Sequence, residues 1–198
     1  FIHEWQDLPV KIAKSFVDVF WDFRRGYLAD SVYENNKDFS VRPNMVFACS
    51  LDYSPVTEDM KAQILWVIEK ELLTPKGLRT LSPRDPNYKK VYEGDQNNRD
   101  SAYHQGTVWP WLVAHFVEGY LKLHKEEGLF MAEQIYNDFE EDMFDYGLAS
   151  IAEIYDGDPP HKPKGTISQA WSVAEVLRIK CMIDDCMERF STNKNLQE

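Results

Sequence analysis

The chain has 198 residues, of which 43% are hydrophobic and 14% aromatic, enough to form one domain or a large part of one. Its net charge of −11 argues against nucleic acid and anionic membranes as partners, because no basic patch is available to neutralise phosphates. No apolar run approaches the ~20 residues of a membrane span, and no signal peptide is recognisable.

Six segments carry helix signals, mostly apolar residues at spacings of three and four. In chain order the predicted helices are residues 8–23, 43–51, 57–72, 111–123, 131–143 and 169–187. Pro43 suits the first turn of the second helix, and Thr57, Thr107 and Ser168 suit the N-caps of three later ones.

No segment alternates polar and apolar residues convincingly, so the order of elements predicts an all-α fold, a solenoid or a toroid of paired helices. We expect one domain over residues 1–190 and a frayed polar tail over residues 191–198. If the helices alternate in direction, the long loops between them can converge at one end of the array.

Two long irregular segments, residues 74–111 and 145–166, separate the predicted helices. Compact domains seldom keep such loops without a use, since ordering them costs backbone entropy. The first loop is rich in sugar-binding groups, because aromatic faces cover C–H bonds and charged groups bond hydroxyls. These residues are Arg79, Arg84, Arg99, Asp85, Asp95, Asp100, Tyr88, Tyr92, Tyr103 and Trp109. Composition alone leaves open a sugar pocket or a well-tied structural loop.

The three cysteines, Cys49, Cys181 and Cys186, form no Cys-x-x-Cys pair, and their odd number argues against a disulfide framework. We expect all three to be reduced packing residues in a cytoplasmic protein.

Asp156 and Asp158 superficially suggest calcium, but the further carboxylates of an EF-hand are missing. No cofactor or metal is expected.

Signatures such as Gly-x-Ser-x-Gly and the Walker A loop do not occur, which leaves carboxylate chemistry. Glu153 lies in a polar loop, but its neighbours are Ile151, Ala152 and Ile154. Apolar surroundings raise the basicity of a carboxylate, as a general base requires. The alternative is an exposed glutamate on a short turn.

The five histidines are dispersed along the chain. His104 and His161 lie in the two long loops, where an imidazole can bind a ligand. His115 and His124 lie on a mostly apolar predicted helix, which is typical of packing or rim positions.

Four stretches resemble the C-terminal region of glycogen debranching enzymes, the domain with amylo-α-1,6-glucosidase activity. They are residues 42–51, residues 72–82, residues 99–111 and residues 151–161, the last leading to Gln169-Ala-Trp-Ser172. The string Tyr-His-Gln-Gly-Thr-Val-Trp-Pro-Trp within the third stretch is long and unusual, and the resemblance spans roughly residues 10–180.

The resemblance implies an (α/α)6 barrel that binds an α-glucan, glycogen or limit dextrin, and hydrolyses α-1,6-linked glucose with inversion. It assigns the general base to Glu153, in the Ser-Ile-x-Glu-Ile motif. It also implies that the sugar pocket is lined by Arg42, Asn44, Arg79, Asp100, His104, Gln105 and Trp109. Trp111 and Trp171 fit either the pocket or the core.

One departure from the family pattern concerns the general acid, an aspartate in a Trp-Met-Asp segment that this chain lacks. A full barrel needs twelve helices and about six are predicted, so we expect the C-terminal half of the catalytic domain. The isolated chain should then be inactive or very weak, since losing the acid costs about 10²–10⁴-fold in rate. An open half-barrel would also expose an apolar seam, which self-association could cover.

Two other functions remain open, and a third is disfavoured. The chain could be a glucan-binding module in which Glu153 does no chemistry, or a glycosidase of the same barrel type with another α-glucoside as substrate. A helical-repeat scaffold for proteins is disfavoured, because no repeat of 30–40 residues is detectable.

Overall fold

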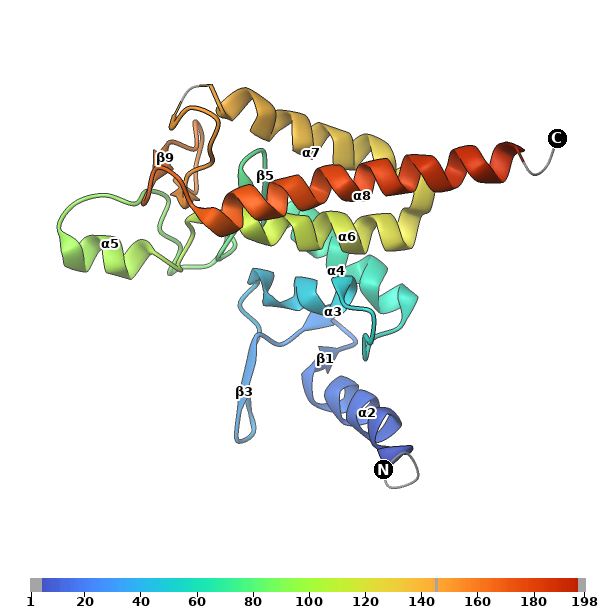
Figure 1. Cartoon of the computed structure of the whole chain (residues 1–198). Coiled ribbons are helices and arrows are strands. Elements are labelled where there is room, and N and C mark those ends of the chain that lie inside the picture. The colour runs from blue at the N-terminus through green and yellow to red at the C-terminus, as the bar shows by residue number, and fades with distance from the viewer. Residues whose placement is uncertain (1–4, 145, 196–198) are drawn as a thin grey trace.

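The computed structural model describes residues 5–144 and 146–195 (Figure 1). Its helices are α2 (Leu8–Phe20), α3 (Phe47–Ser50), α4 (Glu58–Glu71), α5 (Gln96–Ala102), α6 (Val113–His124), α7 (Leu129–Asp142) and α8 (Ala170–Asn195). The 3₁₀ turns η1 (Pro43–Val46), η2 (Pro110–Leu112) and η3 (Lys125–Gly128) lead directly into α3, α6 and α7. Each predicted helix is therefore present, although several ends differ.

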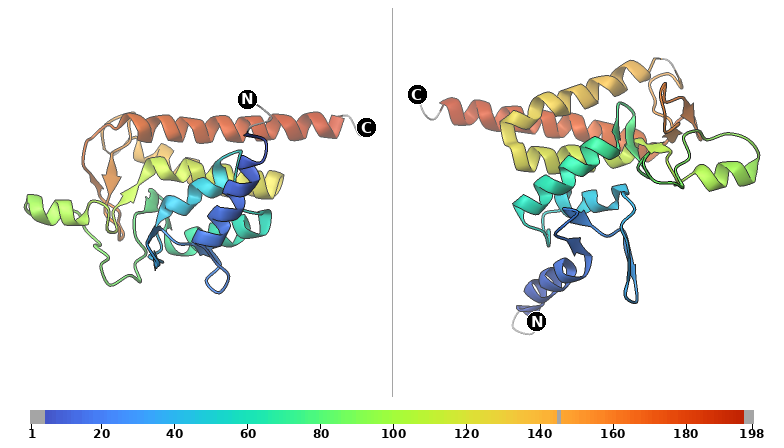
Figure 2. Two further views of the ribbon diagram at one scale, coloured as in Figure 1. Left: turned by 90° about the horizontal axis from the view of Figure 1, so that it is seen from below. Right: turned by 180° about the vertical axis from the view of Figure 1, so that it is seen from behind.

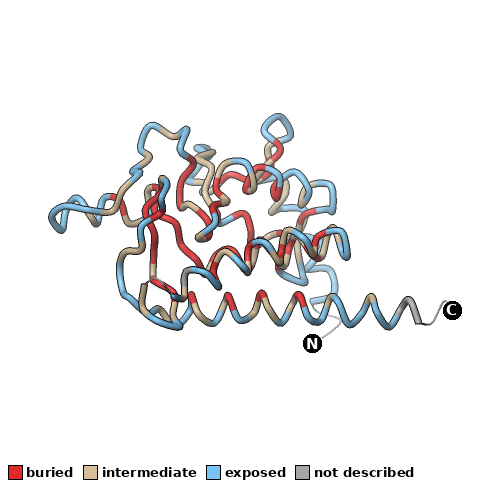
Figure 3. Tube along the Cα trace, turned by 90° about the horizontal axis from the view of Figure 1, so that it is seen from above, coloured by how far each residue is buried: buried red, intermediate tan, exposed pale blue. Residues whose placement is uncertain are grey.

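Helix α6 lies at the centre of the core and contacts α3, α4, α7 and α8 (Figure 1, Figure 2). It is apolar nearly all round, and its buried residues include Val113, Phe116 and Val117, as the sequence predicts. Gly119 allows α3 to approach closely, because a Cβ at that position would lie 2.9 Å from the Cβ of Cys49. Figure 3 shows that buried stretches gather in the middle of the molecule, whereas residues 187–192 of α8 are mostly exposed.

The helices agree with the expected α/α-type fold, but an all-α fold is not confirmed, because the two long loops form a five-stranded antiparallel sheet. Its strands, in spatial order, are β5 (Leu73–Thr74), β6 (Gly77–Arg79), β7 (Val108–Trp109), β8 (Ile154–Tyr155) and β9 (Pro163–Lys164). Two hairpins, β1 (Trp21–Asp22) with β2 (Tyr27–Leu28) and β3 (Ser31–Tyr33) with β4 (Asn36–Asp38), precede it. Strands of two or three residues are too short to show an alternating pattern, so the sequence did not reveal them.

The largest differences from the predicted helices are two helix ends and one additional helix. Helix α2 ends at Phe20, because the chain continues into the β1–β2 hairpin, where Gly26 adopts φ +73°. Helix α5 was not predicted, although Asp95 caps it by accepting a hydrogen bond from the amide of Asn98 at 2.9 Å. Helix α8 continues past Met187 to Asn195, so the first part of the predicted polar tail is helical, and residues 196–198 lie outside the described residues.

The predicted helix starts have mixed outcomes. Pro43 opens η1, and Thr57 caps α4 by accepting a hydrogen bond from the Met60 amide at 3.3 Å, so both predictions are confirmed. Thr107 is not a cap, because its hydroxyl donates to the Tyr103 carbonyl and α6 begins only after η2. Ser168 lies two residues before α8, and its hydroxyl accepts a hydrogen bond from Ser150.

Apolar side chains remain exposed along two helices. Helix α2 buries none of its residues, and Val10 and Ile12 are 72% and 56% exposed. On α8, Leu177 is 63% exposed, and Cys181 is also exposed, so a packing role for Cys181 is wrong. Among the described helices, none is long and apolar enough to cross a membrane.

Candidate functional site

The sheet joins the two long loops, since Val108 of β7 pairs with Tyr155 of β8. A cleft of about 530 Å³ opens next to it. The cleft is lined by Arg42 and the following η1 turn, by residues of the first long loop, by Glu153 just before β8, and by residues at the start of α8. The lining residues are Arg42, Pro43, Asn44, Thr80, Tyr103, His104, Trp109, Trp111, Leu112, Glu153, Gln169 and Trp171.

Glu153 is a half-buried carboxylate at the cleft wall, held at both oxygens. Its Oε2 accepts a hydrogen bond from the amide of Thr166 at 3.0 Å, and its Oε1 accepts one from the Tyr103 hydroxyl. Its own amide donates to the Thr166 carbonyl at 3.0 Å, which extends the pairing of the β8 and β9 segments. Its neighbours Ala152 and Ile154 are buried. Glu153 is therefore not an exposed glutamate on a free turn.

Gly165 makes room for this carboxylate. It adopts φ +67°, which L-residues with a side chain rarely occupy. A Cβ at position 165 would lie only 2.4 Å from Oε2 of Glu153. The glycine thus sets both the turn after β9 and the place of the carboxylate.

Aromatic side chains form another part of the cleft wall. The His104 ring stacks on Trp109, with centroids 5.1 Å apart and an interplanar angle of 15°. Trp171 stacks on Trp111 at 5.6 Å and meets Trp109 edge to face at 5.8 Å. Trp111 and Trp171, whose place the sequence left open, both line the cleft. Such flat rings can cover the C–H face of a sugar.

Arg42 ties three segments together at the cleft floor. One terminal nitrogen donates to the carbonyls of Thr80 and His104, at 3.1 and 2.8 Å, and the other donates to Oε1 of Gln105 at 2.8 Å. Its Nε lies 3.8 Å from a carboxylate oxygen of Asp30. The guanidinium thus organises the cleft and also brings positive charge to it.

Asp30 was not singled out from the sequence. Its other carboxylate oxygen accepts a hydrogen bond from Nδ2 of Asn44 at 2.7 Å, so it orients two cleft residues, Asn44 and Arg42.

Partial burial and the nearby charge of Arg42 lower the pKa of His104. His104 is therefore a neutral imidazole at neutral pH, able both to donate and to accept a hydrogen bond.

The structure brings some predicted site residues into the cleft and leaves others outside. Glu153, Arg42, Asn44, His104 and Trp109 line it.

The other three have different surroundings. Nε of Arg79 donates a hydrogen bond to the Gly157 carbonyl at 2.8 Å. Oε1 of Gln105 accepts a hydrogen bond from Arg42 at 2.8 Å. Asp100 is exposed on α5, which projects from the body of the molecule (Figure 2). A direct sugar contact by Arg79 and Gln105 stays a prediction, whereas the exposed position of Asp100 argues against one for this residue.

The Asp156–Asp158 segment secures the second loop. Asp156 is buried, accepts a hydrogen bond from the amide of Tyr92 at 2.8 Å and lies 3.9 Å from Nζ of Lys164. Asp158 accepts a hydrogen bond from the Tyr88 hydroxyl at 2.9 Å. His161 is buried, with Nδ1 2.9 Å from the Asp156 carbonyl, and it does not line the cleft. These side chains have structural partners instead of facing the cleft.

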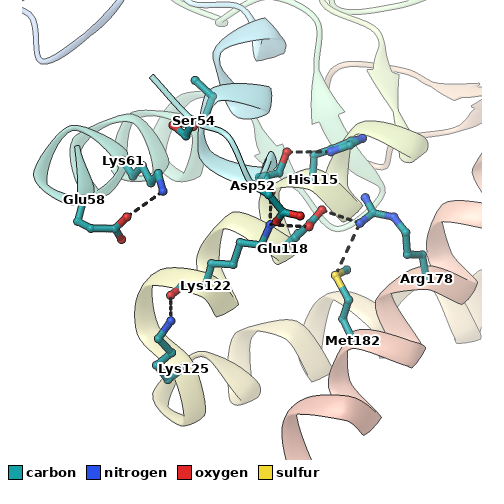
Figure 4. Close-up of polar contacts among 12 residues, drawn as sticks. Asp52, Ser54, Glu58, Lys61, His115, Glu118, Lys122, Lys125, Arg178 and Met182 are labelled. Atoms are coloured by element: carbon teal, nitrogen blue, oxygen red, sulfur yellow. Dashed lines mark hydrogen bonds and ion pairs between the residues drawn. The ribbon is translucent and has the colours of Figure 1, made fainter. Parts of the chain in front are cut away.

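A second group of ionisable side chains joins α6 to α8 (Figure 4). Glu118 on α6 pairs with Nζ of Lys122 at 2.9 Å and with a terminal nitrogen of Arg178 on α8 at 2.7 Å. Nδ1 of His115 lies 3.0 Å from the Ser50 hydroxyl, in the half-buried position expected for a packing histidine. None of these five side chains belongs to the cleft lining.

Comparisons with known proteins bear on both the fold and the site. The amylo-alpha-1,6-glucosidase family matches residues 2–178 of the chain. The glycogen debranching enzyme of Saccharomyces cerevisiae is 25% identical, over 81% of this chain and 12% of that protein. The neutral trehalase Nth1 of the same yeast has a similar fold, with a TM-score of 0.62 and 14% identity, over 92% of this chain and 32% of that one. The chain thus spans a minor part of each relative.

Proposed function

The chain belongs to the amylo-alpha-1,6-glucosidase family, and from this we propose that it supplies the general-base side of a glycoside hydrolase site. Its substrate is an α-1,6-linked glucose on a glycogen-type glucan. The observation that carries the proposal is the Glu153 carboxylate, fixed at both oxygens in the wall of an aromatic cleft.

In this proposal Glu153 takes a proton from a water molecule. The water oxygen forms a bond to the anomeric carbon, and the bond from that carbon to the glycosidic oxygen breaks. A general acid protonates the departing oxygen. Attack from the side opposite the leaving group inverts the anomeric configuration, which requires the two carboxyl groups to stand ~6.5–9.5 Å apart.

The proposed acid comes from outside these 198 residues. Glu153 is the carboxylate in the described cleft lining, whereas Asp100 is exposed on α5 and Asp156 is held by Tyr92 and Lys164. The helices would then form half of an (α/α)6 barrel, and the remaining half would complete the site. The fold similarity to trehalase and the greater length of both relatives support this arrangement.

Substrate binding is assigned to the aromatic wall and to the polar groups beside it. Trp109 and Trp171 offer ring faces to glucose, while His104 and Asn44 offer donors and acceptors to its hydroxyls. A neutral His104 suits this role, because its imidazole can either donate a hydrogen bond to a sugar hydroxyl or accept one from it.

The exposed apolar side chains of α2 and α8 form the seam of the proposed half-barrel. In the isolated chain a second copy would cover this seam, as the sequence analysis expects. Light scattering of the 198-residue chain should therefore give a mass above that of a monomer, and a sharp monomer peak would contradict self-association.

Glucose release from a phosphorylase-limit dextrin tests the proposed function. In the complete natural polypeptide that contains this sequence, Glu153→Gln should lower the rate about 10²–10⁴-fold. Glu140→Gln, an exposed glutamate on α7, is the matched control and should leave the rate unchanged. If Glu153→Gln released glucose at the wild-type rate while glucan binding persisted, the chain would be a binding module without a catalytic base.

A further inference from the structure

We infer that Tyr103 is a positioning residue that orients the Glu153 carboxylate toward the attacking water. The inference rests on the proposed function of Glu153 as general base. Sequence composition had grouped Tyr103 with sugar-binding aromatics, but its hydroxyl donates a hydrogen bond to Oε1 of Glu153, fifty positions further along the chain.

The carboxylate is fixed from three directions. The Tyr103 hydroxyl donates a hydrogen bond to Oε1, and the Thr166 amide donates one to Oε2 at 3.0 Å. Gly165 packs closely against Oε2, because a Cβ at position 165 would lie 2.4 Å from it. The Thr166 contact comes from the backbone, and the hydrogen bond from the Glu153 amide to the Thr166 carbonyl holds that backbone in place. The Tyr103 hydroxyl is therefore the side-chain contact that sets the remaining rotation of the carboxylate.

The Tyr103 ring is itself immobilised by its neighbours. Its centroid lies 4.9 Å from that of Trp109 and 4.8 Å from that of His104, both in edge-to-face contact. Its carbonyl accepts hydrogen bonds from Nε1 of Trp109 at 3.1 Å and from the Thr107 hydroxyl. The ring and its backbone are thus anchored in the cleft wall, and the hydroxyl is presented from a fixed point.

The Tyr103 phenol is protonated at neutral pH. Burial raises the pKa of Tyr103 above its usual value, and the hydrogen bond to Glu153 raises it further. A phenol that stays protonated stays a donor, so it orients the carboxylate without taking away its negative charge. One lone pair on each carboxylate oxygen remains available for water.

Loss of this contact should slow catalysis without weakening substrate binding. In the complete polypeptide, Tyr103→Phe should lower kcat about 10–100-fold and leave KM within about twofold, since the base is present but misaligned. The same deficit should persist with α-glucosyl fluoride, whose leaving fluoride needs little help from an acid. Tyr120→Phe, on α6 and outside the cleft lining, is the matched control and should change neither constant.

A spectroscopic measurement tests the contact independently of turnover. A single 3-fluorotyrosine label at position 103 allows the phenol to be titrated by ¹⁹F NMR in the complete polypeptide. Glu153→Gln should lower the pKa of this phenol, because it removes the negative acceptor that disfavours ionisation.

The outcomes separate the two claims. If Glu153→Gln abolishes hydrolysis but Tyr103→Phe leaves kcat unchanged, the positioning role is refuted and the proposed function stands. If Glu153→Gln moves neither kcat nor the phenol titration, both claims fail. A fall in kcat for Tyr103→Phe, together with a lowered phenol pKa in Glu153→Gln, supports the inference.

Discussion

Two glutamates, Glu118 and Glu153, are each held by two partners, yet the kind of partner differs. Glu118 binds two cations, Lys122 and Arg178. Burial raises the pKa of Glu118, but the two cations lower it by more, so the pKa lies below its usual value. Glu153 binds two neutral donors, a phenol and an amide. Cations neutralise a carboxylate, whereas neutral donors orient it and leave its charge for chemistry. The first arrangement joins two helices, and the second fits a reactive group.

Among variants that keep both Glu153 and Tyr103, the largest effect should come from filling the space beside the Glu153 carboxylate. Gly165→Ala places a Cβ 2.4 Å from Oε2 and should displace the carboxylate, lowering kcat of the complete polypeptide about 10–100-fold. Gly94→Ala is the matched control, because Gly94 also has a positive φ, +93°, but its nearest contacts are side-chain atoms of Asn98. Both variants should lose about 1–2 kcal/mol of stability from backbone strain. A normal kcat for Gly165→Ala would show that the carboxylate position is not critical.

A smaller effect should follow from removing one aromatic side chain from the cleft lining. Trp171 is 45% exposed at the cleft, so Trp171→Ala should weaken glucan binding by about 1–2 kcal/mol, a rise of about 5–30-fold in KM. Trp66 is similarly exposed, at 61%, but lies on α4 outside the cleft lining, so Trp66→Ala is the control. Equal changes in KM for the two variants would argue against a binding role for the cleft wall.

The cation-bound glutamate should affect stability and leave chemistry unchanged. Glu118→Gln should cost about 1–2 kcal/mol at neutral pH, because it removes charged partners from Lys122 and Arg178. Since the folded-state pKa of Glu118 is lowered from 4.5, this stabilisation is present above pH 4.5 and is lost as the pH falls through the folded-state pKa. Urea unfolding should thus separate wild type and variant at neutral pH and bring them together in acid. A stability difference that grew in acid would contradict this sign.

The smallest effect is expected at Asp100, which the family resemblance placed in the sugar pocket. Because Asp100 is exposed on α5 and absent from the cleft lining, Asp100→Ala should change kcat and KM by less than about twofold. A large loss of activity would mean that α5 approaches the substrate in the complete site.

Local sequence signals predicted the helices of this fold, with the exception of α5. The capping hydroxyl of Thr57 and the apolar spacing after it located α4, and the all-round apolar pattern located α6. The strands escaped detection because each is two or three residues long, and because the central pairs of the sheet, β6 with β7 and β7 with β8, join residues far apart in sequence. The pairing of Val108 with Tyr155 is an example, since neither residue sits in an alternating run.

The candidate site was predictable to the extent that its motifs were recognisable. The resemblance identified Glu153 as the base candidate, and the structure brings it to the cleft wall with Arg42 and Trp109. Sequence could not reveal that the Tyr103 hydroxyl reaches Glu153, because their contact depends on how two separate loops cross. For the same reason Gln105, which lies next to His104 in the motif, turned out to support Arg42 from outside the cleft lining.

The most direct test of Glu153 as the base of an inverting reaction uses α-glucosyl fluoride with Glu153→Ala in the complete polypeptide. Without its base the variant should hydrolyse this substrate very slowly. Added azide needs no deprotonation, so it should attack the anomeric carbon, form a C–N bond as fluoride leaves, and yield glucosyl azide of β configuration by NMR. Hydrolysis at the wild-type rate without azide, or an azide product of α configuration, would contradict the assignment.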